Sequence, residues 1–143
     1  MINTKLTRKA MIIAYNAHIG QVDKAFVPYI YHPIHVAEQM EDEVTCIAAL
    51  LHDVVEDTEV TFTDLEKEFP KETIDILRLL THDKNTDYME YIEKIKSNKL
   101  AVKVKIADIK HNMDKSRLDE VDEKALIREE KYKKALKVLE ETF

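Results

Sequence analysis

Glycine is almost missing from this sequence, since the 143 residues include one glycine, three prolines and no tryptophan. Sandwiches, barrels and hairpin-rich folds use glycine at many turns, so its scarcity favours helices. It also excludes the glycine-rich loops that bind phosphate through the backbone, both the G-x-G-x-x-G and the Walker pattern. Any phosphate must therefore be bound by metal ions or basic side chains.

Cysteine is equally scarce, because Cys46 is the only one. A single cysteine excludes an internal disulfide framework and a zinc site made of several cysteines. Its place in the apolar segment 44–51 indicates a buried, unreactive thiol. The sequence has no apolar segment long enough to cross a membrane and no recognisable secretory cleavage site. These absences predict a cytoplasmic protein that does not contact membranes.

The length and the apolar pattern predict one all-α domain over residues 1–143. A chain of this length ordinarily forms a single domain with its own core. Apolar residues make up 45% of the sequence and recur at helical spacing, so seven or eight helices are expected to form one bundle. The expected helices cover residues 4–19, 33–41, 44–56, 63–70, 72–81, 87–96, 100–113 and 122–142.

Charge is distributed unevenly along the chain. The net charge of −6 disfavours nucleic acid as a partner. Residues 25–66 contain ten acidic residues and no lysine or arginine, whereas residues 94–117 contain eight basic residues and two acidic ones. A protein that binds a metal ion and a phosphorylated small molecule would have this distribution. An ordinary charged helix surface would account equally well for the basic segment alone.

Four ionisable side chains directly follow the most apolar segment. His52 and Glu56 are four residues apart, as are Asp53 and Asp57, so on a helix each pair lies on one face. Burying this much charge costs several kcal/mol per ion unless a partner compensates it. A divalent cation would do so, and imidazole with carboxylate suits manganese, iron or zinc. The alternative is a helix end that is open to solvent, with hydrated acidic groups.

Two further metal ligands are expected from other parts of the chain. His32 lies at the end of a loop, and Asp108 lies on an otherwise apolar helix face with Asn112 one turn later. A carboxylate in apolar surroundings needs a partner, which a metal ion would provide. The alternative for Asp108 is a salt bridge to Lys105 or Lys103.

These residues resemble a known family. The order His…His-Asp…Asp is that of the HD-domain metal phosphohydrolases, and the sequence is similar to the hydrolase domain of the RelA/SpoT-type alarmone enzymes and their small stand-alone relatives. Four motifs occur in the family's order: P-Y-x-x-H-P at 28–33, L-H-D-x-x-E-D-T at 51–58, T-x-x-K at 81–84 and K-x-A-D-x-x-x-N at 105–112. Together they cover most of residues 18–118.

The resemblance implies a single HD-type hydrolase domain with (p)ppGpp 3′-pyrophosphohydrolase activity, which releases pyrophosphate from a nucleotide. The implied metal is Mn²⁺, and its ligands would be His32, His52, Asp53 and Asp108. The residues that would orient and deprotonate the attacking water, and manage the proton of the leaving group, are Glu56 and Asp57. The residues implied in substrate binding are Lys24, Lys84 and Asn112.

Two positions on the substrate side depart from the family pattern. The relatives usually carry an arginine just before the lysine that matches Lys24, where it packs on guanine, whereas this chain has Val22 and Asp23. After Asn112 the relatives often read Met-Arg-Thr, whereas residues 113–115 read Met-Asp-Lys. Because every metal and water position matches, the second hypothesis is hydrolysis of another nucleotide or phosphoester by the same site.

An alternative of another class is a metal-containing module that senses a nucleotide without hydrolysing it. Glu56 and Asp57 argue against this alternative, because a binding module has no need of a water-activating pair. A plain helical interaction domain without metal is the simplest alternative. Of the remaining histidines, His35 is expected to support the site by hydrogen bonding and His111 to point elsewhere. The C-terminal helix agrees with both a monomer and a homo-oligomer.

Overall fold

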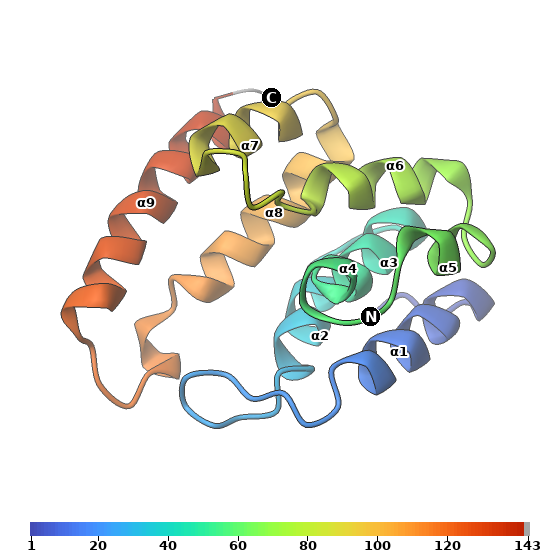
Figure 1. Ribbon diagram of the computed structural model, residues 1–143, viewed down its shortest axis with the longest axis horizontal. Helices are drawn as coiled ribbons and strands as arrows, with labels where there is room; N and C mark the ends of the chain where they lie inside the picture. Colours follow the sequence, from blue (N-terminus) through green and yellow to red (C-terminus); the bar gives the residue numbers. More distant parts are fainter. Residues whose placement is uncertain (142–143) are drawn as a thin grey trace.

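The computed structural model describes residues 1–141, and within this range the chain forms nine α-helices, one short 3-10 helix and no β-strand. The all-α prediction is therefore confirmed (Figure 1). The elements are α1 (Lys5–Ala17), α2 (Tyr31–Glu38), α3 (Glu43–Leu51), α4 (Val54–Asp57), α5 (Phe62–Glu66), α6 (Lys71–Leu80), α7 (Tyr88–Ile95), α8 (Lys99–Asn112), η1 (Lys115–Arg117) and α9 (Glu123–Glu140).

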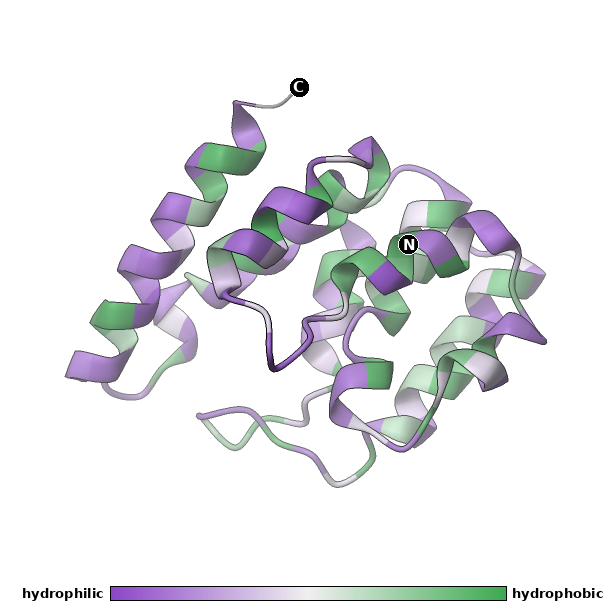
Figure 2. Ribbon diagram, turned by 45° about the horizontal axis from the view of Figure 1, so that its top comes forward, coloured by the Kyte–Doolittle hydropathy of each residue, from purple (hydrophilic) through white to green (hydrophobic). Residues whose placement is uncertain are grey.

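Helix α3 is the centre of the bundle. Seven of its nine residues are buried, and it packs against α1, α2, α6 and α8. Cys46 lies on this helix and is fully buried, as its apolar neighbours predicted. Hydrophobic residues are concentrated on the central helices, whereas α9 is largely hydrophilic (Figure 2). Helix α9 lies at one side of the molecule and packs against α7 and α8 (Figure 1).

Side-chain caps fix the starts of the two helices that matter most for the site. The Asp42 side chain accepts a hydrogen bond from the Thr45 backbone N–H at the start of α3. The Asn98 side chain accepts hydrogen bonds from the Leu100 and Ala101 N–H groups at the start of α8. Such caps satisfy N–H groups that have no partner inside the helix. The two caps therefore fix the first residues of these helices, Glu43 in α3 and Lys99 in α8.

The structure divides the helix that was predicted over residues 44–56. Helix α3 ends at Leu51, and α4 begins at Val54 after the break. The His52 ring donates a hydrogen bond of 2.6 Å from Nδ1 to the Ala49 carbonyl oxygen, which in an uninterrupted helix would accept the Asp53 N–H. The break separates His52 from the helix that carries Glu56. Asp53 and Asp57 stay one turn apart as predicted, because the Asp57 N–H donates to the Asp53 carbonyl oxygen at 3.0 Å.

Other differences from the predicted helices lie at their ends. Helix α5 starts at Phe62, one residue before the expected start at 63, because Thr61 forms a capping box with Asp64. Helix α9 ends at Glu140, and the expected end at residue 142 lies outside the described residues. None of the helices in residues 1–141 is long and apolar enough to span a membrane.

Candidate metal centre and substrate cavity

The four residues predicted as metal ligands lie together in the structure. They come from α2 (His32), the break after α3 (His52 and Asp53) and α8 (Asp108). Each offers one ligand atom, and these atoms all lie within 4.8 Å of one another. Three elements that are far apart in the sequence therefore converge on one cluster, because α2, α3 and α8 pack against each other.

Asp108 Oδ1 is the atom that connects the two histidines. It lies 2.7 Å from His32 Nε2 and 3.2 Å from His52 Nε2. Asp53 Oδ2 lies 3.0 Å from the same His52 nitrogen. Three of these side chains are buried, and Asp53 is partly exposed. The cluster thus combines two imidazole nitrogens with two carboxylates in a largely buried site.

The orientation of His52 is set by the backbone. Its Nδ1 donates to the Ala49 carbonyl, so in the neutral ring Nε2 carries the lone pair and faces the carboxylates. Burial lowers the pKa of His52, but the Asp53 and Asp108 carboxylates outweigh this effect and raise it well above its usual value. The two carboxylates therefore favour a positive charge at Nε2, which a proton or a metal ion can provide.

Asp108 also forms the salt bridge that was considered as its alternative role. Lys105 Nζ lies 2.9 Å from Asp108 Oδ2, and Asn112 Nδ2 donates to Oδ1 at 3.2 Å. Burial raises the pKa of Asp108, but Lys105 and then His52 hold it well below its usual range. The two interpretations are compatible, because Oδ2 faces the lysine while Oδ1 faces the histidines.

The donor set fits a divalent transition metal. Neutral imidazoles and carboxylates are suitable ligands for such ions, and ligating groups are normally held by further hydrogen bonds. Here the Tyr29 hydroxyl donates to Asp53 Oδ2, Lys105 contacts Asp108, and the Ala49 carbonyl holds His52. The cluster could therefore hold a divalent metal ion.

Glu56 and Asp57 lie at the open side of this cluster, on the short helix α4. With Asp53 they form a second acidic group whose ligand atoms lie within 4.8 Å of one another. Glu56 Oε1 accepts a hydrogen bond of 2.7 Å from the backbone N–H of His82, which orients its carboxylate. Burial, Asp53 and Glu56 together raise the pKa of Asp57 to about 6. Both acids are thus close to the cluster although the predicted continuous helix is broken.

The loop between α1 and α2 is tied to α4 by Gln21. The Gln21 amide donates to the Asp57 carbonyl oxygen at 3.1 Å, so its own carbonyl oxygen faces His18 Nδ1 at 2.9 Å. The ring of His18 in turn lies 5.0 Å from that of Tyr29. This chain of contacts fixes the loop against the helix that carries the two acids.

The sequence-based interpretation of His111 was wrong. Its Nδ1 lies 2.7 Å from Nδ1 of His32, so it contacts a predicted metal ligand directly. His35 stacks on His111 with ring centroids 3.9 Å apart, so it supports the site through a stack rather than through the expected hydrogen bond. The spacing was an available signal, since His111 follows Asp108 by three residues on α8 and one turn of a helix separates them.

A cavity of about 410 Å³ adjoins the cluster. Two predicted substrate residues, Lys24 and Asn112, line it, together with Arg117, and α9 contributes Arg128 and Tyr132. The two residues of α9 were missed by the sequence analysis. They are four residues apart, which places them on one helix face, but many charged side chains on this helix have the same spacing.

Lys84 is not among the residues that line this cavity. It is exposed in the loop between α6 and α7. The same loop reaches the site through the His82 backbone N–H that binds Glu56. The structure therefore brings Lys24 and Asn112, but not Lys84, to the cavity beside the metal cluster.

Asp23 is one of the residues at which the sequence departs from the expected family pattern, and it shapes the loop. Its Oδ1 accepts hydrogen bonds from the backbone N–H groups of Ala25, at 2.8 Å, and Val27, at 3.1 Å. Its Oδ2 lies 3.7 Å from an Arg117 nitrogen. Asp23 thus places a carboxylate on the cavity wall and pairs with a basic residue from η1.

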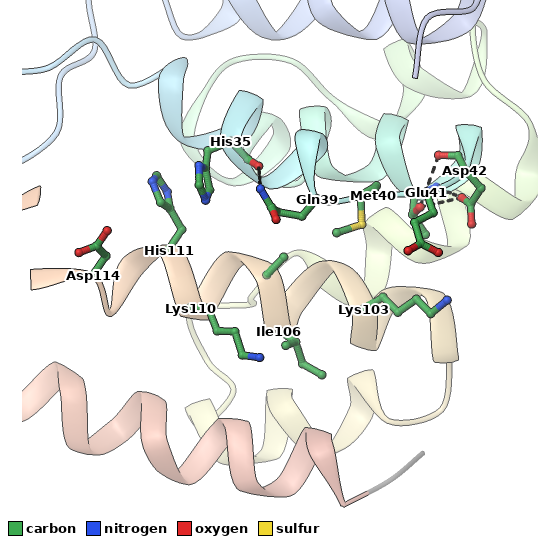
Figure 3. Close-up of a pocket in the computed structure, with 12 residues that line it drawn as sticks. His35, Gln39, Met40, Glu41, Asp42, Lys103, Ile106, Lys110, His111 and Asp114 are labelled. Carbon is green, nitrogen blue, oxygen red and sulfur yellow. Dashed lines mark hydrogen bonds between the residues drawn. The ribbon is translucent and has the colours of Figure 1, made fainter. Parts of the chain in front are cut away.

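A second groove of about 470 Å³ runs between α8 and the segment joining α2 to α3. Figure 3 shows His35 and His111 at one end of it and Lys103 and Asp42 at the other. None of the four predicted metal ligands lines this groove. The four ligands do not line the cavity beside Lys24 either, but two residues of its wall contact them: Tyr29 donates to Asp53 and Asn112 donates to Asp108. This cavity is therefore the better candidate for the substrate, although the groove is larger.

The fold and the cluster agree with a family assignment. The family model described as an HD domain matches residues 10–116, which includes all four predicted ligands. The chain belongs to the HD domain family. A solved structure, titled as that of a metazoan ortholog of SpoT that hydrolyses ppGpp, matches with a TM-score of 0.79 at 24% identity, over 97% of this chain and 87% of that one. This likeness supports the fold.

Two curated proteins are similar to this chain in sequence. The chain is 36% identical over 124 residues to the bifunctional (p)ppGpp synthase/hydrolase SpoT of Escherichia coli, covering 76% of this chain and 18% of the relative. It is 37% identical over 102 residues to the guanosine-3′,5′-bis(diphosphate) 3′-pyrophosphohydrolase MESH1 of Drosophila melanogaster, covering 64% of this chain and 57% of the relative. The chain thus spans about a fifth of the length of the first of these relatives.

Proposed function

We propose that the chain is a metal-dependent phosphohydrolase that removes pyrophosphate from the ribose 3′ position of (p)ppGpp and leaves GDP or GTP. The observation that carries this proposal is the cluster of His32, His52, Asp53 and Asp108 beside a cavity whose wall includes three basic residues. The names of the similar proteins from E. coli and D. melanogaster support the choice of substrate. Mn²⁺ is the proposed metal.

The four clustered residues would hold the metal ion. A divalent ion bound there would polarise a phosphoryl oxygen and make water more acidic, which is its usual contribution to hydrolysis. Tyr29 and Lys105 keep the two ligand carboxylates in place by donating to Asp53 and Asp108. The chain's own residues thus pre-arrange the ligands before any substrate binds.

Glu56 and Asp57 are proposed to move the protons of the reaction. Water adds to the phosphorus that is attached to the ribose 3′ oxygen, the bond between them breaks, and pyrophosphate leaves. One proton goes from the water to a carboxylate, and one returns to the 3′ oxygen of the product. The hydrogen bond from the His82 N–H orients Glu56 for the first of these transfers.

The cavity is proposed to bind the rest of the nucleotide. Lys24 and Arg128 line it from opposite parts of the chain, the α1–α2 loop and α9, so both can approach the same phosphate groups. Asn112 connects this cavity with the metal cluster, because it lines the cavity and donates to Asp108. A phosphorylated substrate would therefore span both parts of the site.

Product analysis tests the proposed reaction. The purified protein with Mn²⁺ is expected to convert ppGpp into GDP and pyrophosphate, and the variant Asp53→Ala is expected to lose this activity because a metal ligand is missing. Both products are quantified by anion-exchange chromatography, with ATP, GTP and dinucleotides as parallel substrates. Turnover that persists in Asp53→Ala would identify a contaminant and contradict the proposal.

A second candidate is a different nucleotide substrate for the same chemistry. The observation that favours it is Asp23, whose carboxylate lines the cavity near the position where the relatives carry an arginine. An inert ppGpp together with cleavage of another nucleotide in the same assay would select this candidate.

Removing Arg128 is expected to weaken substrate binding more than turnover. The variant Arg128→Ala deletes a cation from the cavity wall but leaves the metal ligands intact, so KM should rise about tenfold or more, while kcat changes little. The matched control is Lys134→Ala, which removes one positive charge from an exposed position of the same helix. Equal effects of both variants on KM would show that only the net charge of α9 matters.

A further inference from the structure

The two ring nitrogens of His32 face two different side chains. Nε2 lies 2.7 Å from Asp108 Oδ1 inside the ligand cluster, and Nδ1 lies 2.7 Å from Nδ1 of His111. The His32 side chain is 2% exposed, so water does not compete for either nitrogen. The orientation of this ring therefore depends on both contacts.

The contact between His32 and His111 is an edge-to-edge hydrogen bond. The two rings are nearly parallel, at 7°, and their centroids lie 5.0 Å apart. At a nitrogen–nitrogen distance of 2.7 Å, two imidazole rings reach this separation only when the nitrogens point directly at each other. A straight contact of this kind is the favourable geometry for a hydrogen bond.

His35 contacts His111 in a different way. Its ring lies at 15° to that of His111 with the centroids 3.9 Å apart, which is a face-to-face stack. The Arg117 guanidinium also donates to the His111 carbonyl oxygen at 2.8 Å. Figure 3 shows His35 and His111 beside each other at the end of the groove. The plane of His111 is therefore fixed from one face while its edge remains directed at His32.

The chemistry of imidazole decides which way the hydrogen bond runs when a metal is bound. A neutral ring has one N–H and one lone pair. In His32 the lone pair of Nε2 faces the cluster, so a metal ligand must carry its proton on Nδ1, where His111 Nδ1 is the acceptor. The other histidine of the cluster has a comparable acceptor, because His52 Nδ1 donates to the Ala49 carbonyl.

We propose that His111 is a positioning residue of the metal centre, which holds His32 in its metal-binding tautomer and orientation by accepting the Nδ1 proton. Metal-ligating histidines generally donate this second N–H to a carboxylate, a carbonyl or water. Here a neutral imidazole, stacked on His35, takes that place. The inference rests on the metal site of the proposed function but not on its substrate.

Metal affinity tests this role without any substrate. We expect the dissociation constant for Mn²⁺, measured by isothermal titration calorimetry, to rise about 10- to 100-fold in His111→Ala. The variant His111→Asn keeps a side-chain oxygen near the former Nδ1, so it should recover most of the affinity. The matched control is Lys110→Ala, which changes an exposed neighbour of His111 on α8 that pairs with Glu140 and should stay within about threefold of the unchanged protein.

Two results would overturn the proposal. One is unchanged Mn²⁺ affinity in His111→Ala. The other is an affinity of His111→Asn as weak as that of His111→Ala when circular dichroism and the unfolding temperature show that both variants are folded. Because nucleotide is absent from these titrations, a His111 effect in a protein that leaves ppGpp intact would sustain this inference and contradict only the proposed substrate.

Discussion

Replacing Asp108 with alanine is expected to lower the free energy of unfolding by about 3–5 kcal/mol, because removing one partner of a buried ion pair leaves the other charge uncompensated. The charge left behind is the Lys105 ammonium, whose side chain is 13% exposed and lies 2.9 Å from Asp108 Oδ2. Burial raises the pKa of Asp108, but Lys105 and then His52 hold it well below its usual range, so the carboxylate is charged at neutral pH. Urea denaturation of the metal-free protein at neutral pH measures the loss.

The double variant Lys105→Met with Asp108→Leu is the matched control for this effect. It removes both charges and keeps apolar volume at both positions, so it should regain most of the stability that Asp108→Ala loses. It should still bind no Mn²⁺, because a ligand is missing. A double variant as unstable as the single one would show that packing, rather than the buried charge, accounts for the loss.

Glu56→Gln is expected to lower kcat for ppGpp about 10²- to 10⁴-fold, because the amide cannot accept a proton from the attacking water. The change leaves an oxygen that can still accept from the His82 N–H, so the local structure should persist. Mn²⁺ affinity should stay nearly the same, since Glu56 is not one of the four clustered ligands. Single-turnover kinetics and calorimetry together separate the two quantities.

Glu59→Gln serves as the control for Glu56→Gln, because Glu59 is an exposed acid three residues further along the chain. It makes the same change of charge outside the cluster and should leave kcat within about twofold, as is usual for surface substitutions. A normal kcat in Glu56→Gln, or an equal loss in both variants, would contradict the proton-transfer role.

The convergence of the four predicted ligands could be anticipated because their chemistry conflicts with their surroundings. Asp108 is a carboxylate on an apolar helix face, and His52 and Asp53 follow an apolar helix. Such charges need partners when buried, so the residues that share this property are expected to meet. The structure shows that they do.

Local backbone geometry was harder to predict. Apolar residues stand on both sides of His52 and Asp53, at 44–51 and at 54–55, so their pattern gives no sign that α3 ends at Leu51. The break depends on the His52 ring taking the Ala49 carbonyl, which is a competition between a side chain and the backbone. Periodicity records where apolar residues lie, but it does not record such a competition.

Residues that act through another side chain were also missed. Tyr29 and His111 lie within the quoted motifs, but their roles come from contacts with Asp53 and His32 across the fold, which the motifs alone do not reveal. The single-domain organisation, the cytoplasmic location and the oligomeric state stay predictions.

Helix α9 contributes to the cavity wall but provides none of the four clustered residues. The family model ends at residue 116, whereas Arg128 and Tyr132 of α9 form part of the cavity wall. Only Ala125, Ala135 and Leu139 of this helix are buried, and it rests on α7 and α8 rather than on α2 or α3. Natural variation or engineering on this one peripheral helix would therefore reshape one wall of the proposed substrate cavity, while the four clustered residues in the rest of the bundle stay untouched.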